Sequence, residues 1–412
     1  MLSSRNLQWG LAWIVPIIAE AAAFGRSILL AWVIVPAELG QAMMLALTLR
    51  LVEMATDLGV ERLIVQATGG DSPHLQADLH GISLLRGLVG ALILLLLAPV
   101  LAHLFNGGPS TLTYCAIALA PLIRGAAHLD YRRAERTFSY VKLTVVEGGA
   151  SLAMLASTLP ALWLFADHRA MAVALIAHCC TFSLLSRLLA HRGYKATISM
   201  RAVKRSWTFG APLIMNALLL FATFYADRLV VANAYSWSEL ALYGVALQLA
   251  LLPAQIVGRA AASLVMPALR NATDHHSFLD VWTRTLSTHA VLAAAMFVGF
   301  TLVSPPLIQT LYSDALRPDF ALALALAAAS AFRILRTPYS QLAILSGRTA
   351  DPARANLWRA LALVPAIGCA AFGLPLVAIA TCAAIGEAAA TLRAAQLSRT
   401  SLQISTDQEC FA

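Results

Sequence analysis

Residues 26–66 read RSILLAWVIVPAELGQAMMLALTLRLVEMATDLGVERLIVQ, and this stretch decides how the rest of the chain is interpreted. Most of it is apolar enough for a membrane, yet its hydrophobic runs carry charged side chains in or beside them, among them Arg26, Arg50, Glu53 and Asp57. An ionised group in hydrocarbon costs several kcal/mol unless it faces protein or water. We therefore expect these charges to face the interior of a helix bundle.

The composition of the whole chain agrees with a membrane location. Of the 412 residues, 59% are hydrophobic and only 12% are charged, and the mean hydropathy is +0.74. A soluble domain carries about 25% charged residues. Residues 1–8 run directly into an apolar segment of spanning length, so we expect no removable signal peptide.

Apolar runs of about 20 residues predict an all-α integral membrane protein with about 12 transmembrane helices. The runs are too long and continuous for the strands of a barrel. The predicted spans are 9–31, 38–60, 80–104, 110–129, 142–165, 169–190, 207–232, 239–267, 285–312, 320–345, 356–374 and 376–396.

Basic residues predict the orientation of these spans. With the N-terminus in the cytoplasm, the outer loops hold little beyond Arg169 and Arg317. The inner loops hold Arg132, Arg133, Arg136, Lys142, Arg187, Arg192, Lys195, Arg201, Lys204, Arg205, Arg270, Arg284, Arg348 and Arg354. This asymmetry predicts that both termini lie in the cytoplasm. Because the basic groups lie in short loops and form no groove for phosphates, the net charge of +8 does not indicate nucleic-acid binding.

An internal repeat is suggested by a shift of 201 residues, which lays Pro36-Ala37-Glu38-Leu39 on Trp237-Ser238-Glu239-Leu240 (237 minus 36). We predict two pseudo-symmetric six-helix lobes in parallel orientation, with a substrate path between them. The N-terminal lobe covers 1–190, a basic cytoplasmic linker 191–206, the C-terminal lobe 207–396 and a cytoplasmic tail 397–412.

The second predicted helix has a charged face. Arg50, Glu53, Asp57 and Glu61 lie within a stripe about 80° wide if the helix is continuous, and Arg50 can pair with Glu53. The stripe either lines a transport path or forms internal ion pairs that fix helix packing.

Arginine is far more frequent than lysine in the spans, and its planar fork suits carboxylate or phosphate oxygens. The candidate substrate-binding residues are Arg50, Arg124, Arg333, Arg336, Arg259, Arg86, Arg26 and Arg228. Desolvated acids that could couple transport to protons are Glu20, Glu53, Asp57, Asp227 and Glu387. Two simpler explanations stay open: a GC-rich genome for the arginine content, and an interfacial anchor or helix cap for Arg26, Asp227 and Arg228.

No enzyme, metal or cofactor signature is present in the sequence. It contains no HExxH, GxSxG or GxxxxGK[ST] motif. The six cysteines have no paired CxxC spacing. His275 and His276 are adjacent and point to different helix faces, which makes a poor metal pair. We predict neither catalytic residues nor a metal site nor a cofactor.

Several motifs resemble the polysaccharide-export and O-antigen flippases of the Wzx type. Their superfamily also contains lipid II flippases and multidrug and toxin extruders. That family opens with a Gly-Pro-x-acidic-aromatic-Gly corner and an Asp-x-Gly one helix later. The matching residues here are Pro36, Glu38, Gly40, Asp57 and Gly59, whereas Val35 and Leu39 replace the usual glycine and aromatic.

The resemblance continues through most of the chain. The end of the seventh helix and the stretch after it are similar at Asp227, Arg228, Tyr243 and Ala246, although Ala241 stands where glycine is common. The inner loop before the fifth helix is similar at Tyr131, Arg132, Arg133, Glu147 and Gly149.

The resemblance implies a flippase that moves a polyprenyl-diphosphate-linked oligosaccharide across the inner membrane by alternating access of two lobes. Implied partners are this anionic lipid-linked glycan, membrane lipids, and polysaccharide polymerase or export machinery. The main alternative is a multidrug or cation extruder of the same fold, which would favour acidic and aromatic cavity residues. A membrane-embedded glycan polymerase or acyltransferase is a further alternative, but it requires a large outer loop that this chain lacks.

Overall fold

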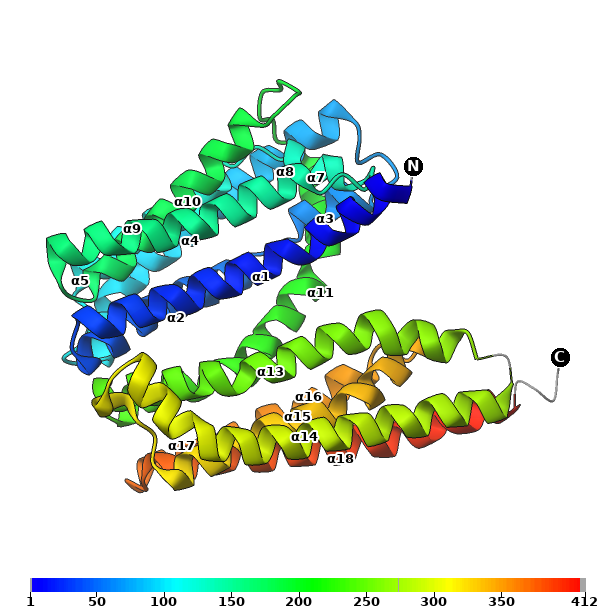
Figure 1. Ribbon diagram of the computed structural model, residues 1–412. Coiled ribbons are helices and arrows are strands. Elements are labelled where there is room, and N and C mark those ends of the chain that lie inside the picture. Colours follow the sequence, from blue (N-terminus) through cyan, green and yellow to red (C-terminus); the bar gives the residue numbers. More distant parts are fainter. Residues whose placement is uncertain (1, 273, 408–412) are drawn as a thin grey trace. The chain divides into compact units, whose positions relative to one another are not determined.

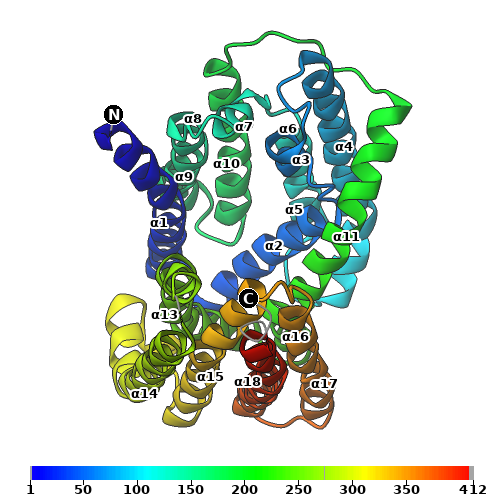
Figure 2. The ribbon, with the colours of Figure 1, turned by 90° about the vertical axis from the view of Figure 1, so that its right-hand side faces the viewer.

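The computed structural model describes residues 2–272 and 274–407, and this part of the chain is helical without β-strands. It forms two compact units, Met1–Phe221 and Ala222–Ala412. Figure 1 shows the helices of each unit along their length, and Figure 2 shows them closer to end-on.

Unit 1 contains the first eleven α-helices, nearly all of α11 included. They are α1 (Leu2–Val33), α2 (Pro36–Ala55), α3 (Val60–Gln66), α4 (Pro73–Leu104), α5 (Thr111–Ile117), α6 (Leu119–Gly125), α7 (Asp130–Glu135), α8 (Val141–Leu143), a π-helical turn (Thr144–Gly148), α9 (Gly149–Phe165), α10 (Arg169–Leu188) and α11 (Met200–Phe224).

Unit 2 begins at the end of α11 and contains seven further α-helices. They are α12 (Ala226–Ala234), α13 (Trp237–Arg270), α14 (His275–Leu311), a 3₁₀ turn (Asp314–Leu316), α15 (Phe320–Leu345), α16 (Asp351–Leu361), α17 (Leu363–Ala371) and α18 (Leu376–Asp407).

Nine helices among the described residues are long and apolar enough to cross a membrane. Each corresponds to one predicted span. The other three predicted spans, 38–60, 110–129 and 356–374, occur as shorter pieces: α2 with α3, α5 with α6, and α16 with α17. The prediction that they are continuous was wrong, as it was for 207–232, which breaks at Tyr225. Hydropathy depends on the side chains that face lipid, so it does not reveal where the backbone of an apolar segment leaves the helical conformation.

Helix α15 is the packing centre of unit 2, where it contacts α13, α14 and α18. Its first half reads FALALALAAASAF, and alanines allow neighbouring helices to approach closely. Ala323, Leu326 and Ala327 are fully buried there. In unit 1 the corresponding contacts run from α10 to α9, α6 and α2.

The loops of unit 1 gather at its two ends. At one end Asp71 of the α3–α4 loop pairs with Arg133 of α7 and with Arg192 after α10. At the other end Glu38, at the start of α2, accepts hydrogen bonds from His168 before α10, and Gln41 donates to the Gly107 carbonyl after α4. The helices therefore traverse unit 1 from end to end, as membrane spans do.

Candidate functional site

The Asp57-Leu58-Gly59 segment interrupts the second predicted span. Asp57 Oδ1 accepts the backbone N–H of Gly59 at 3.0 Å. Gly59 has φ +65°, a left-handed conformation that favours glycine because it has no Cβ. Arg50, Glu53, Asp57 and Glu61 therefore do not lie on one continuous helix as predicted. They nevertheless all line the same cavity.

This cavity, of about 520 Å³, lies within unit 1 and is strongly charged. Its wall is formed by α2, α3, α4, α6, α7 and α11. The charged lining residues are Arg50, Arg62, Arg86, Arg124, Arg132, Glu53, Asp57, Glu61 and Glu135. Asn216, Leu213, Ala217 and Leu220 of α11 add a largely apolar wall.

Two glycines bring α4 and α6 together beside this cavity. A Cβ built on Gly87 would lie 3.0 Å from the Gly125 Cα, and the reverse distance is the same. A larger residue at either position would force the helices apart. The close approach brings Arg86 and Arg124, the residues immediately before these glycines, into one cavity.

Most carboxylates of the cavity are already neutralised by arginine. Arg86 Nη1 lies 3.0 Å from Asp57 Oδ1. Arg132 contacts three carboxylates, at 2.8 Å to Glu61, 3.2 Å to Glu135 and 2.7 Å to Glu147. Charge-assisted hydrogen bonds of this kind are strong and directional.

Three arginines of the cavity wall form no ion pair among the described residues: Arg50, Arg62 and Arg124. The predicted pair between Arg50 and Glu53 is absent from the described part, and Arg50 is exposed. Arg124 instead lies over the Phe182 ring, 4.0 Å from its centroid. Among the acidic residues that line the cavity in the described part of the chain, Glu53 is the one without an ion pair. The cavity therefore offers more free guanidinium groups than free carboxylates.

A second charged cluster lies in unit 2 around Glu387, whose side chain is 1% exposed. Arg333 contacts Glu387 at 2.6 Å, Arg359 at 2.9 Å and Arg336 at 3.3 Å. The three arginines have further contacts in unit 2. Arg333 and Arg359 lie over the Phe224 ring, and Arg336 donates a hydrogen bond to the Asn356 side-chain oxygen.

The Glu387 cluster differs from the cavity in unit 1 in its accessibility. The side chains of Arg333, Arg336 and Arg359 are only 11%, 9% and 9% exposed. A buried carboxylate must be paired to remain charged, and three arginines do so here. Glu387 is thus compensated within unit 2 itself.

Asp227 and Arg228 lie at the start of α12. Asp227 Oδ2 accepts a hydrogen bond from the buried Tyr243 hydroxyl at 2.7 Å, and Asp227 Oδ1 accepts the Arg228 backbone N–H. Arg228 lies 5.3 Å from the Tyr225 ring centroid. Three of the four residues behind the family resemblance in this region thus form one local contact set, which ties α12 to α13.

The remaining predicted residues lie outside both charged sites. Arg26 of α1 contacts the Met154 sulfur at 2.7 Å. Glu20 is also on α1 and Arg259 is on α13, and neither lines the cavity of unit 1. The structure therefore brings together Arg50, Arg86, Arg124, Glu53 and Asp57 in one place, and Arg333, Arg336 and Glu387 in another.

Two important arginines were missed in the sequence. Arg132 was read as a topology determinant and as part of the family resemblance but was not selected as a site residue, and Arg359 was not selected although it lies within a predicted span. The available signal for Arg132 was a carboxylate three residues after it, whereas nothing local in the sequence marked Arg359. Their other partners are distant in sequence and depend on helix rotation.

Solved structures show which fold this arrangement belongs to. A multidrug resistance transporter of the MATE family, in the MOP superfamily, has a TM-score of 0.75 and 13% identity, over 94% of this chain and 96% of that one. The lipid II flippase MurJ has a TM-score of 0.75 and 14% identity, over 95% and 88%. A MOP superfamily transporter from Pyrococcus furiosus has a TM-score of 0.57 and 12% identity, over 97% and 94%.

The protein is therefore a multi-pass membrane protein with the fold of MOP-superfamily transporters. The family described as polysaccharide biosynthesis protein matches residues 29–318, and the chain belongs to this family. No curated protein matches the chain. The proteins that share this fold are named as transporters and a flippase.

Proposed function

We propose that this protein is a flippase that moves a polyprenyl-diphosphate-linked oligosaccharide across the bacterial inner membrane. The observation that carries the proposal is the arginine-rich cavity of unit 1 in a member of a polysaccharide biosynthesis family. The lipid II flippase MurJ, which shares the fold, supports a lipid-linked substrate.

The chemistry of the cavity supports an anionic headgroup. A diphosphate requires cationic hydrogen-bond donors, and guanidinium groups bind phosphate oxygens in a two-pronged geometry. Arg50 and Arg124 provide such groups without an ion-paired carboxylate among the described residues. The ion-paired residues Arg86 and Arg132 keep their neighbouring acids from opposing the substrate. Binding should stay moderate, because a carrier must also release its anion.

The two charged sites have different roles in this proposal. The open cavity of unit 1 takes the headgroup, with Arg50 and Arg124 as its main ligands and Glu53 as the remaining coupling candidate. In unit 2, Arg333, Arg336 and Glu387 support the fold together with Arg359, because their side chains are buried against one another. Alternating access of the two lobes completes the cycle.

A multidrug extruder is the second candidate, and the MATE transporter of the same fold favours it. Pocket polarity separates the two functions, since a cationic drug would be repelled by free guanidinium groups. The Pyrococcus furiosus transporter is described as having a binding pocket of reverse polarity that suggests a different function. We expect expression of this protein to give no protection against a panel of cationic drugs.

Deletion of the gene, followed by analysis of lipid-linked glycans, tests the proposal. Surface polysaccharide should decrease, and the carrier-linked repeat unit should accumulate on the cytoplasmic side. Expression of the wild-type chain from a plasmid should reverse both effects. A strain that keeps normal surface glycan without accumulation, in a background with no second flippase, would overturn the proposal.

A further inference from the structure

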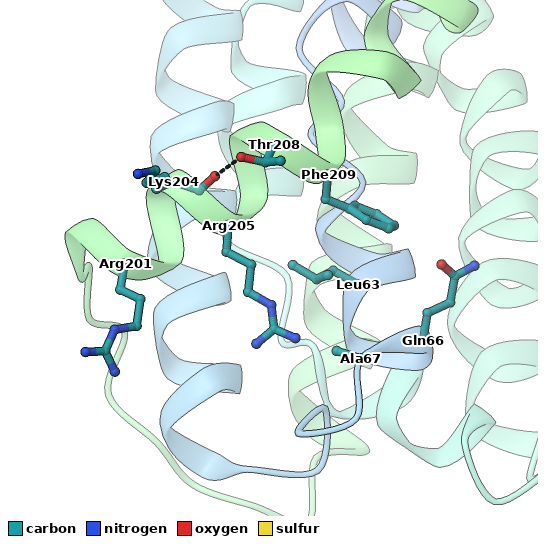
Figure 3. A pocket seen from close by; sticks show the side chains of 8 residues that line it. All are labelled: Leu63, Gln66, Ala67, Arg201, Lys204, Arg205, Thr208 and Phe209. Atoms are coloured by element: carbon teal, nitrogen blue, oxygen red, sulfur yellow. Dashed lines mark hydrogen bonds between the residues drawn. The ribbon is translucent and has the colours of Figure 1, made fainter.

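A second pocket of unit 1, of about 790 Å³, lies where the first turns of α11 pass α3. Figure 3 shows basic side chains from α11 on one side, Arg201, Lys204 and Arg205. The remaining lining residues are the apolar Leu63 of α3, Ala67 directly after α3 and Phe209 of α11, together with the polar Gln66 and Thr208. Arg205 extends into the space between the two helices.

The charge of this pocket is of one sign. Arg201, Lys204 and Arg205 are exposed and form no ion pair among the described residues, and no carboxylate lines the pocket. By contrast, Lys142 contacts Asp130 at 2.8 Å, and Arg192 contacts Asp71. The three cations on α11 are therefore available to an external anion.

An apolar stripe lies next to the basic residues on the same helix. Met200, Trp207, Met215 and Leu218 are 81%, 62%, 69% and 37% exposed. At about 100° per residue, the centre of this stripe lies about 90° around α11 from the centre of the basic residues. Exposed apolar residues on a spanning helix offer a surface that acyl chains can contact. The pocket thus combines cationic groups with an adjoining surface for a lipid tail.

We propose that this pocket binds the phosphate headgroup of an anionic glycerophospholipid, such as phosphatidylglycerol, from the cytoplasmic leaflet. The acyl chains lie along the Met200–Leu218 stripe of α11. The side of the membrane rests on the orientation predicted from the basic loops, whereas the site is independent of which glycan is transported. Each basic side chain near an anionic bilayer surface adds attraction. The lipid would fix the start of α11 against α3.

The test measures lipid retention by the full-length protein in detergent, using native mass spectrometry with added phosphatidylglycerol or phosphatidylcholine. The variant R201Q/K204Q/R205Q removes the three pocket charges. The matched control K195Q/R270Q/R399Q removes three exposed basic residues that do not line the pocket. We expect at least about tenfold weaker retention of phosphatidylglycerol by the pocket variant and an unchanged value for the control.

Two further arms separate the possible sources of the phosphate. Sodium pyrophosphate at millimolar concentration should displace little phosphatidylglycerol, because it has no tail to contact α11. Geranylgeranyl diphosphate should compete no better than phosphatidylglycerol itself. Equal loss in both triple variants, equal retention of phosphatidylcholine, or displacement by pyrophosphate alone would each overturn the proposal. Strong preference for geranylgeranyl diphosphate would also overturn it and assign the pocket to the substrate path.

The outcome can be read even if the triple variant folds poorly. The comparison of phosphatidylglycerol with phosphatidylcholine uses only the wild-type protein. Increasing ionic strength from low to molar salt should weaken retention of phosphatidylglycerol, because exposed charges are screened over a few ångströms at high salt. Retention that is independent of salt would contradict an electrostatic headgroup site.

Discussion

Arg50 and Arg124 differ from Arg86 and Arg132 because they line the same cavity without an ion pair among the described residues. A hydrogen bond to a charged group contributes about 1.5–3 kcal/mol. Replacing either residue by glutamine should therefore lower glycan export about tenfold or more at limiting substrate. Membrane abundance should stay near the wild-type value, because no buried partner is left unpaired.

Export by the R50Q and R124Q variants can be measured as surface polysaccharide, with abundance followed by immunoblotting of membranes. Arg284→Gln is the matched control, since Arg284 is 79% exposed and its ion pair among the described residues is with Asp280 on its own helix. Loss of abundance that parallels the loss of export would show that these arginines support the fold and do not bind substrate.

For Glu387 we expect a loss of stability, because its removal leaves three buried guanidinium groups without their shared carboxylate. Breaking a buried pair on one side costs about 3–5 kcal/mol. We expect Glu387→Gln to lower the thermal unfolding temperature of the purified protein strongly. Asp280→Asn, at an exposed pair, should change it little, since such pairs contribute about 0–1 kcal/mol. A Glu387→Gln protein as stable as the wild type would show that the Glu387 cluster does not stabilise unit 2.

Asp130 gives a prediction about pH outside the spanning helices. Burial of its carboxyl opposes ionisation, but the His191 N–H, Lys142 and Arg133 outweigh that effect and hold the pKa of Asp130 below its usual value. The stabilisation is therefore fully present above the unfolded pKa of about 3.9 and is lost only as the pH falls towards the folded value. Asp130→Asn should lower the unfolding temperature by the same amount at pH 5 and at pH 8. A difference that grows steadily over this range would show that another group is responsible.

At the scale of the element, the break between α2 and α3 depends on Gly59. A Cβ at this position would lie 2.5 Å from Leu213 Cδ1 and 3.0 Å from Phe209 Cε1, and the residue has φ +65°. The left-handed conformation costs a non-glycine residue about 1–2 kcal/mol, and overpacking about 1–3 kcal/mol. Gly59→Ala should therefore destabilise unit 1 by about 2–5 kcal/mol and also reduce export.

Gly258→Ala provides the control for this substitution. Gly258 lies within α13, and a Cβ there would meet no atom within 4 Å. Alanine in a helix interior is favoured over glycine by about 1 kcal/mol. The control should be neutral or slightly more stable in the same thermal unfolding measurement. If both variants behave alike, the break at Gly59 is not required for the packing of α11 on α3.

The elements also show how far sequence reasoning reached. Hydropathy located the apolar helices, because lipid-facing side chains cover most of their surface. It missed the breaks at Gly59 and Tyr225, which arise from backbone conformation within runs that stay apolar. The stripe containing Arg50 and Asp57 does converge on one cavity, but through two helices and a turn. The partners of Arg132 and Arg359 were beyond reach, because helix rotation brings distant segments together.

At the scale of the whole molecule, the orientation of the chain follows from the alternation of its loops between the two ends of the helices. Loops at one end of unit 1 carry Arg133, Arg192 and Asp71 in contact, and loops at the other end carry Glu38 and His168 in contact. Each loop therefore belongs to one side of the membrane, and a single side assignment fixes all of them. Basic residues concentrate at the first end, which predicts that this end is cytoplasmic.

Reporter insertions test this orientation directly. Alkaline phosphatase inserted after Gly108 or Asp167 should be active, because these loops are predicted to lie outside. The same enzyme inserted after Lys195, in the segment before α11, should be inactive, whereas green fluorescent protein there should fluoresce. Phosphatase activity at Lys195 with none at Gly108 would reverse the orientation of unit 1. It would also move Arg201, Lys204 and Arg205 away from the cytoplasmic leaflet, so this measurement bears on the lipid site as well as on the direction of transport.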